Sequence, residues 1–282
     1  MKKLYLILLL LSLMALNSIA NDGSFQASGG QLVPVKETDI SVKKEILRLR
    51  RNGRRMMVDV YYEFYNPTAD YKKLIVGFET PPPSGDFYVP EGRDIYKEQP
   101  SIYNFSVRVN GQKLMYEVAL YPYNSTYALS PEQILQMKRR DERGEGSDEI
   151  EFEYVYYFDA VFKPGMNIVR HTYQYDVSGS VDTEFEFPYD LTPACRWANG
   201  QIDDFTLIID MGAPESFLIS QRFFNSSDTW TIHGEGNQFY DAQYKAKGFN
   251  VRSGYVEFKK KNFKPAGELF IFKKRKIENE YY

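Results

Sequence analysis

Carboxylates at alternating positions are the residues of this sequence best suited to chemistry. Glu151 and Glu153 lie two residues apart and therefore project from the same face of a strand. Glu184 and Glu186 form a second pair of this kind. Two carboxylates that flank a glycosidic bond can cleave it, one as the acid and the other as base or nucleophile. A solvated sheet face shows the same spacing, and catalytic pairs usually come from distant strands, so no catalytic residue is assigned.

The histidines and aspartates form no recognisable metal motif. We expect His171 to be a buried neutral ring bonded to a tyrosine or a carbonyl, and His233 to be solvated in a turn with Gly234–Gly236. The two histidines lack the close spacing of zinc ligands. Asp203–Asp204 and Asp210 bracket a strand without the spacing of a calcium loop. The sequence therefore predicts no metal and no cofactor.

A single cysteine, Cys195, excludes an internal disulfide framework. Its surroundings in sequence are more typical of a small buried hydrophobe than of a nucleophile. No Gly-x-Ser-x-Gly elbow, P-loop or dinucleotide fingerprint occurs. The net charge of −3 argues against a nucleic-acid partner, because such proteins normally present a basic face.

Aromatic side chains provide the candidate ligand-binding residues. The chain has 23 tyrosines and 20 phenylalanines but only two tryptophans. An exposed aromatic ring beside a polar loop can stack on a sugar, whereas a large ring can also plug one end of a sandwich. The candidates are Tyr121, Tyr123, Tyr127, Trp197 and Trp230, and packing remains the alternative for both tryptophans.

The elements that must position these residues are predicted to be strands. Apolar residues alternate with polar ones along most of the chain, for example from Val58 to Phe64 and from Ile150 to Phe162. Asn110-Gly111 predicts a hairpin, with a return strand from Leu114 to Leu120. Strands separated by turns, without intervening helical patterns, predict an all-β fold, an antiparallel β-sandwich that is one large unit or two consecutive ones.

One helix interrupts this pattern. Ser130 and Gln133 form a capping box around Pro131, which predicts a short helix inserted near residues 130–141. We divide the chain into a signal peptide at 1–20, an N-terminal β-sandwich region at 21–198 and a C-terminal β region at 199–282. The last two regions can also be one continuous sandwich.

The first residues predict export. Lys2 and Lys3 precede an apolar core, and small residues end at Ala20, where a signal peptidase would cleave. The apolar stretch is shorter than a membrane span, and no transmembrane segment is expected in the mature chain. The predicted location is therefore the periplasm or the extracellular space.

Several short stretches together resemble a known group of proteins. They are Gly29–Val35, Val58–Asn66, Phe162–Gly165, Tyr189–Ala194 and Trp197–Gly200. Their order is similar to that of an uncharacterised family of exported bacterial all-β proteins, some of which carry a C-terminal YARHG-type module. No YARHG motif occurs here. The resemblance extends from about Asn21 to about Asp210, and it implies bacterial origin, export and β architecture but no activity.

These observations leave three functional hypotheses. The first is an exported non-enzymatic β-sandwich that binds an envelope component, a glycan or a protein. The alternative is a carbohydrate-active enzyme, which would have an acid of raised pKa facing a second carboxylate. The third is a part of a surface complex, which would show an unpaired edge strand or a large apolar patch.

Overall fold

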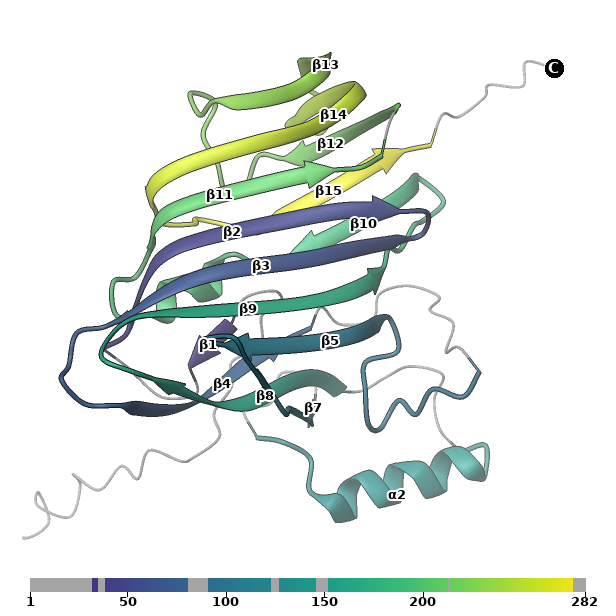
Figure 1. The fold of residues 1–282 in the computed structure, drawn as a ribbon. Helices are drawn as coiled ribbons and strands as arrows, with labels where there is room; N and C mark the ends of the chain where they lie inside the picture. The colour runs from purple at the N-terminus through teal and green to yellow at the C-terminus, as the bar shows by residue number, and fades with distance from the viewer. Residues whose placement is uncertain are drawn as a thin grey trace, which may run out of the picture.

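The computed structural model describes residues 32–34, 39–80, 91–122, 127–145, 152–212 and 214–275. Strands dominate this part of the chain (Figure 1). They are β1 (Leu32–Pro34), β2 (Ser41–Asn52), β3 (Arg55–Asn66), β4 (Lys72–Glu79), β5 (Ile102–Val109), β6 (Gln112–Leu114), β7 (Glu117–Pro122), β8 (Phe152–Phe162), β9 (Gly165–Asp176), β10 (Thr183–Tyr189), β11 (Ile202–Asp210), β12 (Glu215–Ser220), β13 (Trp230–Asp241), β14 (Ala246–Phe263) and β15 (Leu269–Lys274). The helices are α2 (Pro131–Glu142) and the short 3-10 helix η1 (Thr192–Arg196). The predicted all-β class is confirmed.

The larger of two sheets has 11 strands in the order β10-β15-β12-β14-β11-β2-β3-β9-β5-β6, with β13 paired to β14. Neighbouring strands are antiparallel except β2 and β11, which are parallel. The long strand β14 pairs with β12 through residues 246–251 and with β11 through residues 256–263. The sheet bends at this strand, so β12, β15 and β10 lie behind the part formed by β11, β2 and β3 (Figure 1).

A second sheet, in the order β1-β4-β8-β7, packs on the part of the large sheet formed by β3, β9 and β5. Aromatic rings make this contact. The ring centroids of Phe78 and Tyr173 are 4.8 Å apart, and those of Phe105 and Tyr156 are 5.0 Å apart. Both pairs belong to one hydrophobic cluster that also includes residues of β11, β14 and β15. The architecture is therefore a sandwich whose two layers share one core.

The predicted alternation along β3 is confirmed. Val58, Val60, Tyr62 and Phe64 are each at most 2% exposed, whereas the residues between them are partly exposed. Branched and aromatic side chains suit such a half-buried strand. Burial of one large apolar side chain stabilises the fold by roughly 1.5–3 kcal/mol, so packing of this kind can hold the core without a disulfide.

The predicted return strand from Leu114 to Leu120 is wrong as a single element. Its first part, β6, ends at Leu114 and pairs with β5, whereas β7 begins at Glu117 and pairs with β8 in the other sheet. Met115 is 89% exposed at this crossing. The alternation of side chains continues through the crossing, and therefore does not reveal that the chain changes sheets.

The turn predicted at Gly234–Gly236 is also wrong, because these glycines lie inside β13. Gly234 is paired with Gly254 of β14, and a β-bulge follows between Glu235 and Gly236. A Cβ atom on Gly254 would lie 1.7 Å from the carbonyl oxygen of His233. The glycines therefore permit a close approach of two strands instead of a change of direction.

The predicted inserted helix is confirmed as α2. Ser130 is its N-cap and forms the capping box with Gln133, and Pro131 opens the helix. None of its residues is fully buried, but Ile134 and Met137 pack partly against the core. Hydrogen bonds from Tyr96 to Asp141 and from Lys138 to Asp94 attach the helix to the preceding segment.

Among the described residues, no helix is long and apolar enough to cross a membrane. The predicted signal peptide at 1–20 lies outside them. Strands from both sides of the predicted boundary at residue 198 lie in the large sheet, where β2 pairs with β11. The division into one or two domains stays a prediction.

Candidate functional site

The outer face of the large sheet, on β14, β11, β2, β3 and β9, has the arrangement best suited to bind a ligand. Strand alternation creates it. On β2, Leu47 and Leu49 are buried in the core, while Ile46 and Arg48 point away from it. The neighbouring strands are in register, so their outward residues form rows across the sheet.

Two of these rows are defined by the strand pairing. In the central row, the directly opposed residues are Lys259, Thr206, Ile46, Tyr61 and Arg170, taken from β14 to β9. In the adjacent row, which we name the Arg48 row, they are Glu257, Ile208, Arg48, Asp59 and Thr172. Each row therefore combines charged side chains with uncharged ones.

Two hollows lie along these rows. The first has a volume of about 480 Å³ and is lined by Lys44, Ile46, Arg48, Asp204, Thr206, Ile208, Glu257, Lys259, Lys260 and Lys261. The second has a volume of about 380 Å³ and is lined by Ile46, Arg48, Asp59, Tyr61 and Arg170. Ile46 and Arg48 line both, so the two hollows meet at these side chains.

Cations outnumber carboxylates in the first hollow. The carboxylate of Asp204 lies 2.8 Å from Lys261 Nζ and 3.9 Å from Lys44 Nζ, so this one acid forms ion pairs with two lysines. Glu257 lies 2.9 Å from Lys259 Nζ. Burial tends to raise the pKa of Glu257, but hydrogen bonds from Lys259 and His233 hold it below its usual value. Glu257 is therefore ionised near neutral pH, and the cations that line the hollow outnumber its two acids.

Arg48, which lies where the two hollows meet, is a cation without an acidic partner among the described residues. It is exposed and directly opposite Asp59. Both oxygens of Asp59 already accept hydrogen bonds from Arg170, whose Nε lies 2.8 Å from Oδ1. Within the part of the chain that the structure describes, no carboxylate forms an ion pair with Arg48. Its five donors are available to an anionic ligand.

Tyr61 and Ile46 provide partly exposed uncharged surface beside Arg48. The phenol of Tyr61 donates a hydrogen bond to Glu63 Oε1 at 3.0 Å. Burial, followed by this contact with Glu63, raises the pKa of Tyr61, so the phenol stays protonated. A ligand at Arg48 could thus also contact a neutral ring and an aliphatic side chain.

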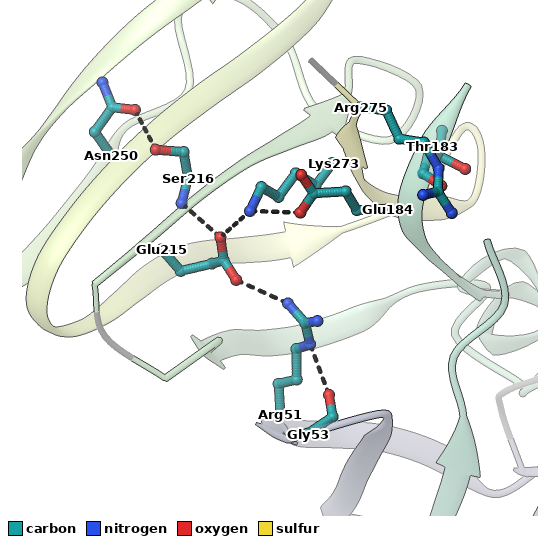
Figure 2. Close-up of polar contacts among 9 residues, drawn as sticks. All are labelled: Arg51, Gly53, Thr183, Glu184, Glu215, Ser216, Asn250, Lys273 and Arg275. Carbon is teal, nitrogen blue, oxygen red and sulfur yellow. Dashed lines mark hydrogen bonds and ion pairs between the residues drawn. The ribbon is translucent and has the colours of Figure 1, made fainter. Parts of the chain in front are cut away.

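A separate ionic network links strands of the large sheet (Figure 2). Glu215 on β12 lies 2.8 Å from Arg51 on β2 and 2.9 Å from Lys273 on β15. Lys273 also lies 2.6 Å from Glu184 on β10. Every charge in this set has an opposite partner, and the set joins strands of the large sheet that are far apart in its strand order. We therefore interpret it as structural.

The predicted aromatic candidates are mostly buried. Trp197 is 2% exposed and packs against Phe64, and Trp230 is 4% exposed. Tyr121 is 4% exposed on the outer side of the second sheet, whereas Tyr127 is 57% exposed. Tyr123 lies outside the described residues. The two tryptophans pack in the core, which was the alternative for them, and the ligand-binding assignment of this set stays a prediction.

His171 is buried as expected, but neither ring nitrogen has a hydrogen-bond partner in the described part of the chain. His233 is exposed, as expected, and stacks on Tyr255, with its Nε2 3.1 Å from Glu257. Asp203 accepts hydrogen bonds from Asn199, Gln201 and Lys43. These contacts give each polar group a structural explanation except the ring of His171.

The carboxyl of Glu79, at the end of β4, was missed by the sequence analysis. It is 3% exposed, and burial raises its pKa to about 8, with Arg196 opposing and Glu153 and Asp190 adding to the rise. Burial also raises the pKa of Glu153. Glu79 follows the inward residue Phe78 on β4, so its place in the sequence predicts an outward, solvated side chain and does not indicate burial.

The third hypothesis required a free sheet edge, and β13 is such a strand. It pairs with β14 over Trp230–Asp241 and with no other described strand. Its bulge at Glu235 and Gly236 interrupts the regular ladder. Bulges of this kind protect edge strands against pairing with another chain, so β13 gives little support for an assembly role.

Comparisons with known proteins give a fold and no activity. A family model described as a domain of unknown function (DUF4424) matches residues 20–124. No curated protein matches the chain. The crystal structure of a candidate nutrient binding protein from Legionella pneumophila is similar to 89% of this chain and 73% of that one, with a TM-score of 0.55 and 16% identity. This likeness shows a shared fold alone.

Weaker similarities involve larger enzymes. An M1 zinc metallopeptidase from Deinococcus radiodurans aligns with 85% of this chain and 43% of that one, at 10% identity and a TM-score of 0.31. Leukotriene A4 hydrolase from Saccharomyces cerevisiae aligns with 84% of this chain and 29% of that one, at 8% identity and a TM-score of 0.36.

Proposed function

We propose that this chain is an exported, non-enzymatic binding protein that takes the anionic group of an envelope component on the outer face of its large sheet. The observation that carries the proposal is Arg48, an exposed cation at the junction of two hollows whose nearest opposed acid, Asp59, is bound by Arg170. The N-terminal segment ending at Ala20 supports export, and the nutrient-binding name of the Legionella relative is compatible with a binding role.

An arginine is well suited to this task. Its planar guanidinium presents parallel donors that match a carboxylate or a phosphate, and it stays charged at any physiological pH. Ile46 and Ile208 beside it provide aliphatic surface for an uncharged part of the ligand. Although the chain as a whole is acidic, this positive patch would concentrate anions locally.

Calorimetric titration with galacturonate, a sugar carrying one carboxylate, tests the proposal. We expect binding that weakens as salt is added, and at least about tenfold weaker binding in Arg48→Gln, since a hydrogen bond to a charged group contributes about 1.5–3 kcal/mol. Arg50→Gln is the matched control, because Arg50 is on the same strand face, is exposed and lines neither hollow. Equal affinity in both variants would refute the proposal.

Glu79 favours a second candidate function, cleavage of a carbohydrate by a pair of carboxylates. A buried acid with a pKa near 8 is protonated at neutral pH and could act as a general acid, with Glu153 as the nearby carboxylate. A reducing-end assay on acidic and neutral polysaccharides tests it. Turnover that disappears in Glu79→Gln would support this function, and the absence of turnover in the unmodified chain would end it.

A further inference from the structure

The central row has a cation at each end and uncharged surface between them. Lys259 stands at one end and Arg170 at the other, with Thr206, Ile46 and Tyr61 in between. Adjacent strands are about 4.8 Å apart, so the row spans roughly 19 Å. A row this long exceeds what one small anion can contact, and it runs perpendicular to the strands.

Positive charge also continues beyond the end of the row. Arg108 on β5 is exposed and directly opposite Arg170 on β9. The side chain of Lys259 is 63% exposed, although it pairs with Glu257. The side chain of Arg170 is 55% exposed, although it pairs with Asp59, and its guanidinium keeps donors that Asp59 does not use. Arg48 lies beside the middle of the row, between these two ends. The cations are therefore distributed along a line instead of being gathered around one point.

The groups that this face presents indicate whether an extended ligand is a peptide or a polysaccharide. A peptide bound to a sheet is normally recognised through main-chain hydrogen bonds at a free strand edge. Here the backbone groups of β11, β2 and β3 are already paired on both sides, so only side chains face the ligand. Those side chains offer the partly exposed phenol ring of Tyr61 and the aliphatic side chain of Ile46 between cations, whereas Thr206 is only 8% exposed. Such a surface suits sugar rings that carry acidic groups.

We infer that the ligand is a linear acidic polysaccharide that lies across the strands along the central row, with its carboxylate, sulfate or phosphate groups at Lys259, Arg48 and Arg170. This inference rests on the proposed function and specifies its ligand. The polymer contacts both hollows at once, and its middle unit packs on Tyr61 and Ile46.

Chain-length dependence of binding tests this inference. The probes are galacturonate and its linear dimer, tetramer and octamer, titrated calorimetrically into the purified chain. We expect affinity to rise with length by at least about tenfold and to level off once the fragment spans the row. In Lys259→Gln and in Tyr61→Ala, the ratio of octamer affinity to galacturonate affinity should fall about fivefold. Circular dichroism confirms that each variant is folded, and Arg50→Gln serves as the matched charge control.

The outcomes separate the two proposals. If Arg48→Gln weakens galacturonate binding but the octamer binds no tighter than galacturonate, the polysaccharide inference is overturned and the anion-binding function stands. If Arg48→Gln leaves galacturonate binding unchanged, the function itself fails. An octamer of glutamate that binds as tightly as the galacturonate octamer, or maltooctaose that does so, would overturn the acidic-polysaccharide class. Dextran sulfate that binds with the same dependence on Lys259 would support it.

Discussion

Phe78 and His171 face each other across the interior of the sandwich, with their ring centroids 5.3 Å apart. Phe78 is on β4 of the second sheet, and His171 is on β9 of the large sheet. The imidazole is fully buried, and the rings of Tyr62, Phe105 and Tyr173 also surround it. Burial lowers the pKa of His171 to about 3, against a small opposing effect of Asp59. A titratable group is thus held neutral inside an aromatic core.

This arrangement predicts a loss of stability in acid. The unfolded chain binds a proton at His171 below about pH 6.5, whereas the folded chain does so only near pH 3, so stability falls as pH drops through this window. The loss attributable to His171 is about 1.4 kcal/mol per pH unit. Urea unfolding at about pH 7 and about pH 5 measures it. The His171→Phe variant should lose markedly less stability between the two; an identical loss in both proteins would contradict the prediction.

Glu79 predicts the opposite dependence. Because burial raises its pKa from 4.5 to about 8, the folded chain holds a proton that the unfolded chain has released, and stability falls as pH rises through this range. Glu79→Gln keeps the shape and removes the titration. We expect the variant to gain stability relative to the unmodified chain as the pH is raised from about 5 to about 8. Thermal unfolding across that range measures the difference, and a constant difference would refute the prediction.

The individual strands and the helix could be predicted from the sequence, but the way in which the chain connects and pairs them could not. Val58 to Phe64 show their inward positions directly in sequence, and Ser130 with Gln133 places the helix, because both signals are local. The crossing at Met115 and the parallel pairing of β2 with β11 depend on contacts between distant segments. No local pattern contains this information. The glycines of β13 misled for the same reason, since only Gly254 on the partner strand explains them.

The candidate site depends on register, and for this reason the sequence analysis missed it. Ile46, Tyr61 and Arg170 are separated in sequence but directly opposed in the sheet. Each appears in sequence as an ordinary outward residue of its own strand. The aromatic residues that stood out by type, Trp197 and Trp230, are instead buried. The residues selected by their type thus belong to the core, whereas the residues of the candidate site are brought together by strand pairing.

The close approach of β13 and β14 predicts that Gly254 cannot be replaced. Its φ is +85°, and a Cβ atom would lie 1.7 Å from the carbonyl oxygen of His233, a backbone atom that cannot move without breaking the strand pair. Gly254→Ala should therefore destabilise the chain by more than about 2 kcal/mol. Gly53→Ala is the matched control. The φ of Gly53 is +62°, but a Cβ atom added there would meet no other part of the protein within 4 Å. Only the backbone strain of about 1 kcal/mol therefore remains. Urea midpoints that shift equally for both would show that the clash is relieved.

The network around Glu215 predicts a measurable coupling between β2, β12, β15 and β10 of the large sheet (Figure 2). Arg51 and Glu215 are only 20% and 16% exposed, and Glu215 also contacts Lys273, so Glu215→Gln leaves two partly buried cations short of one acid. We expect a loss of about 1–3 kcal/mol. Asp159→Asn is the control, because Asp159 and Lys73 are 58% and 66% exposed and such pairs contribute about 0.2–1 kcal/mol. Urea unfolding in low and high salt compares the variants, and a Glu215→Gln effect no larger than that of Asp159→Asn would show that the network does not hold these strands together.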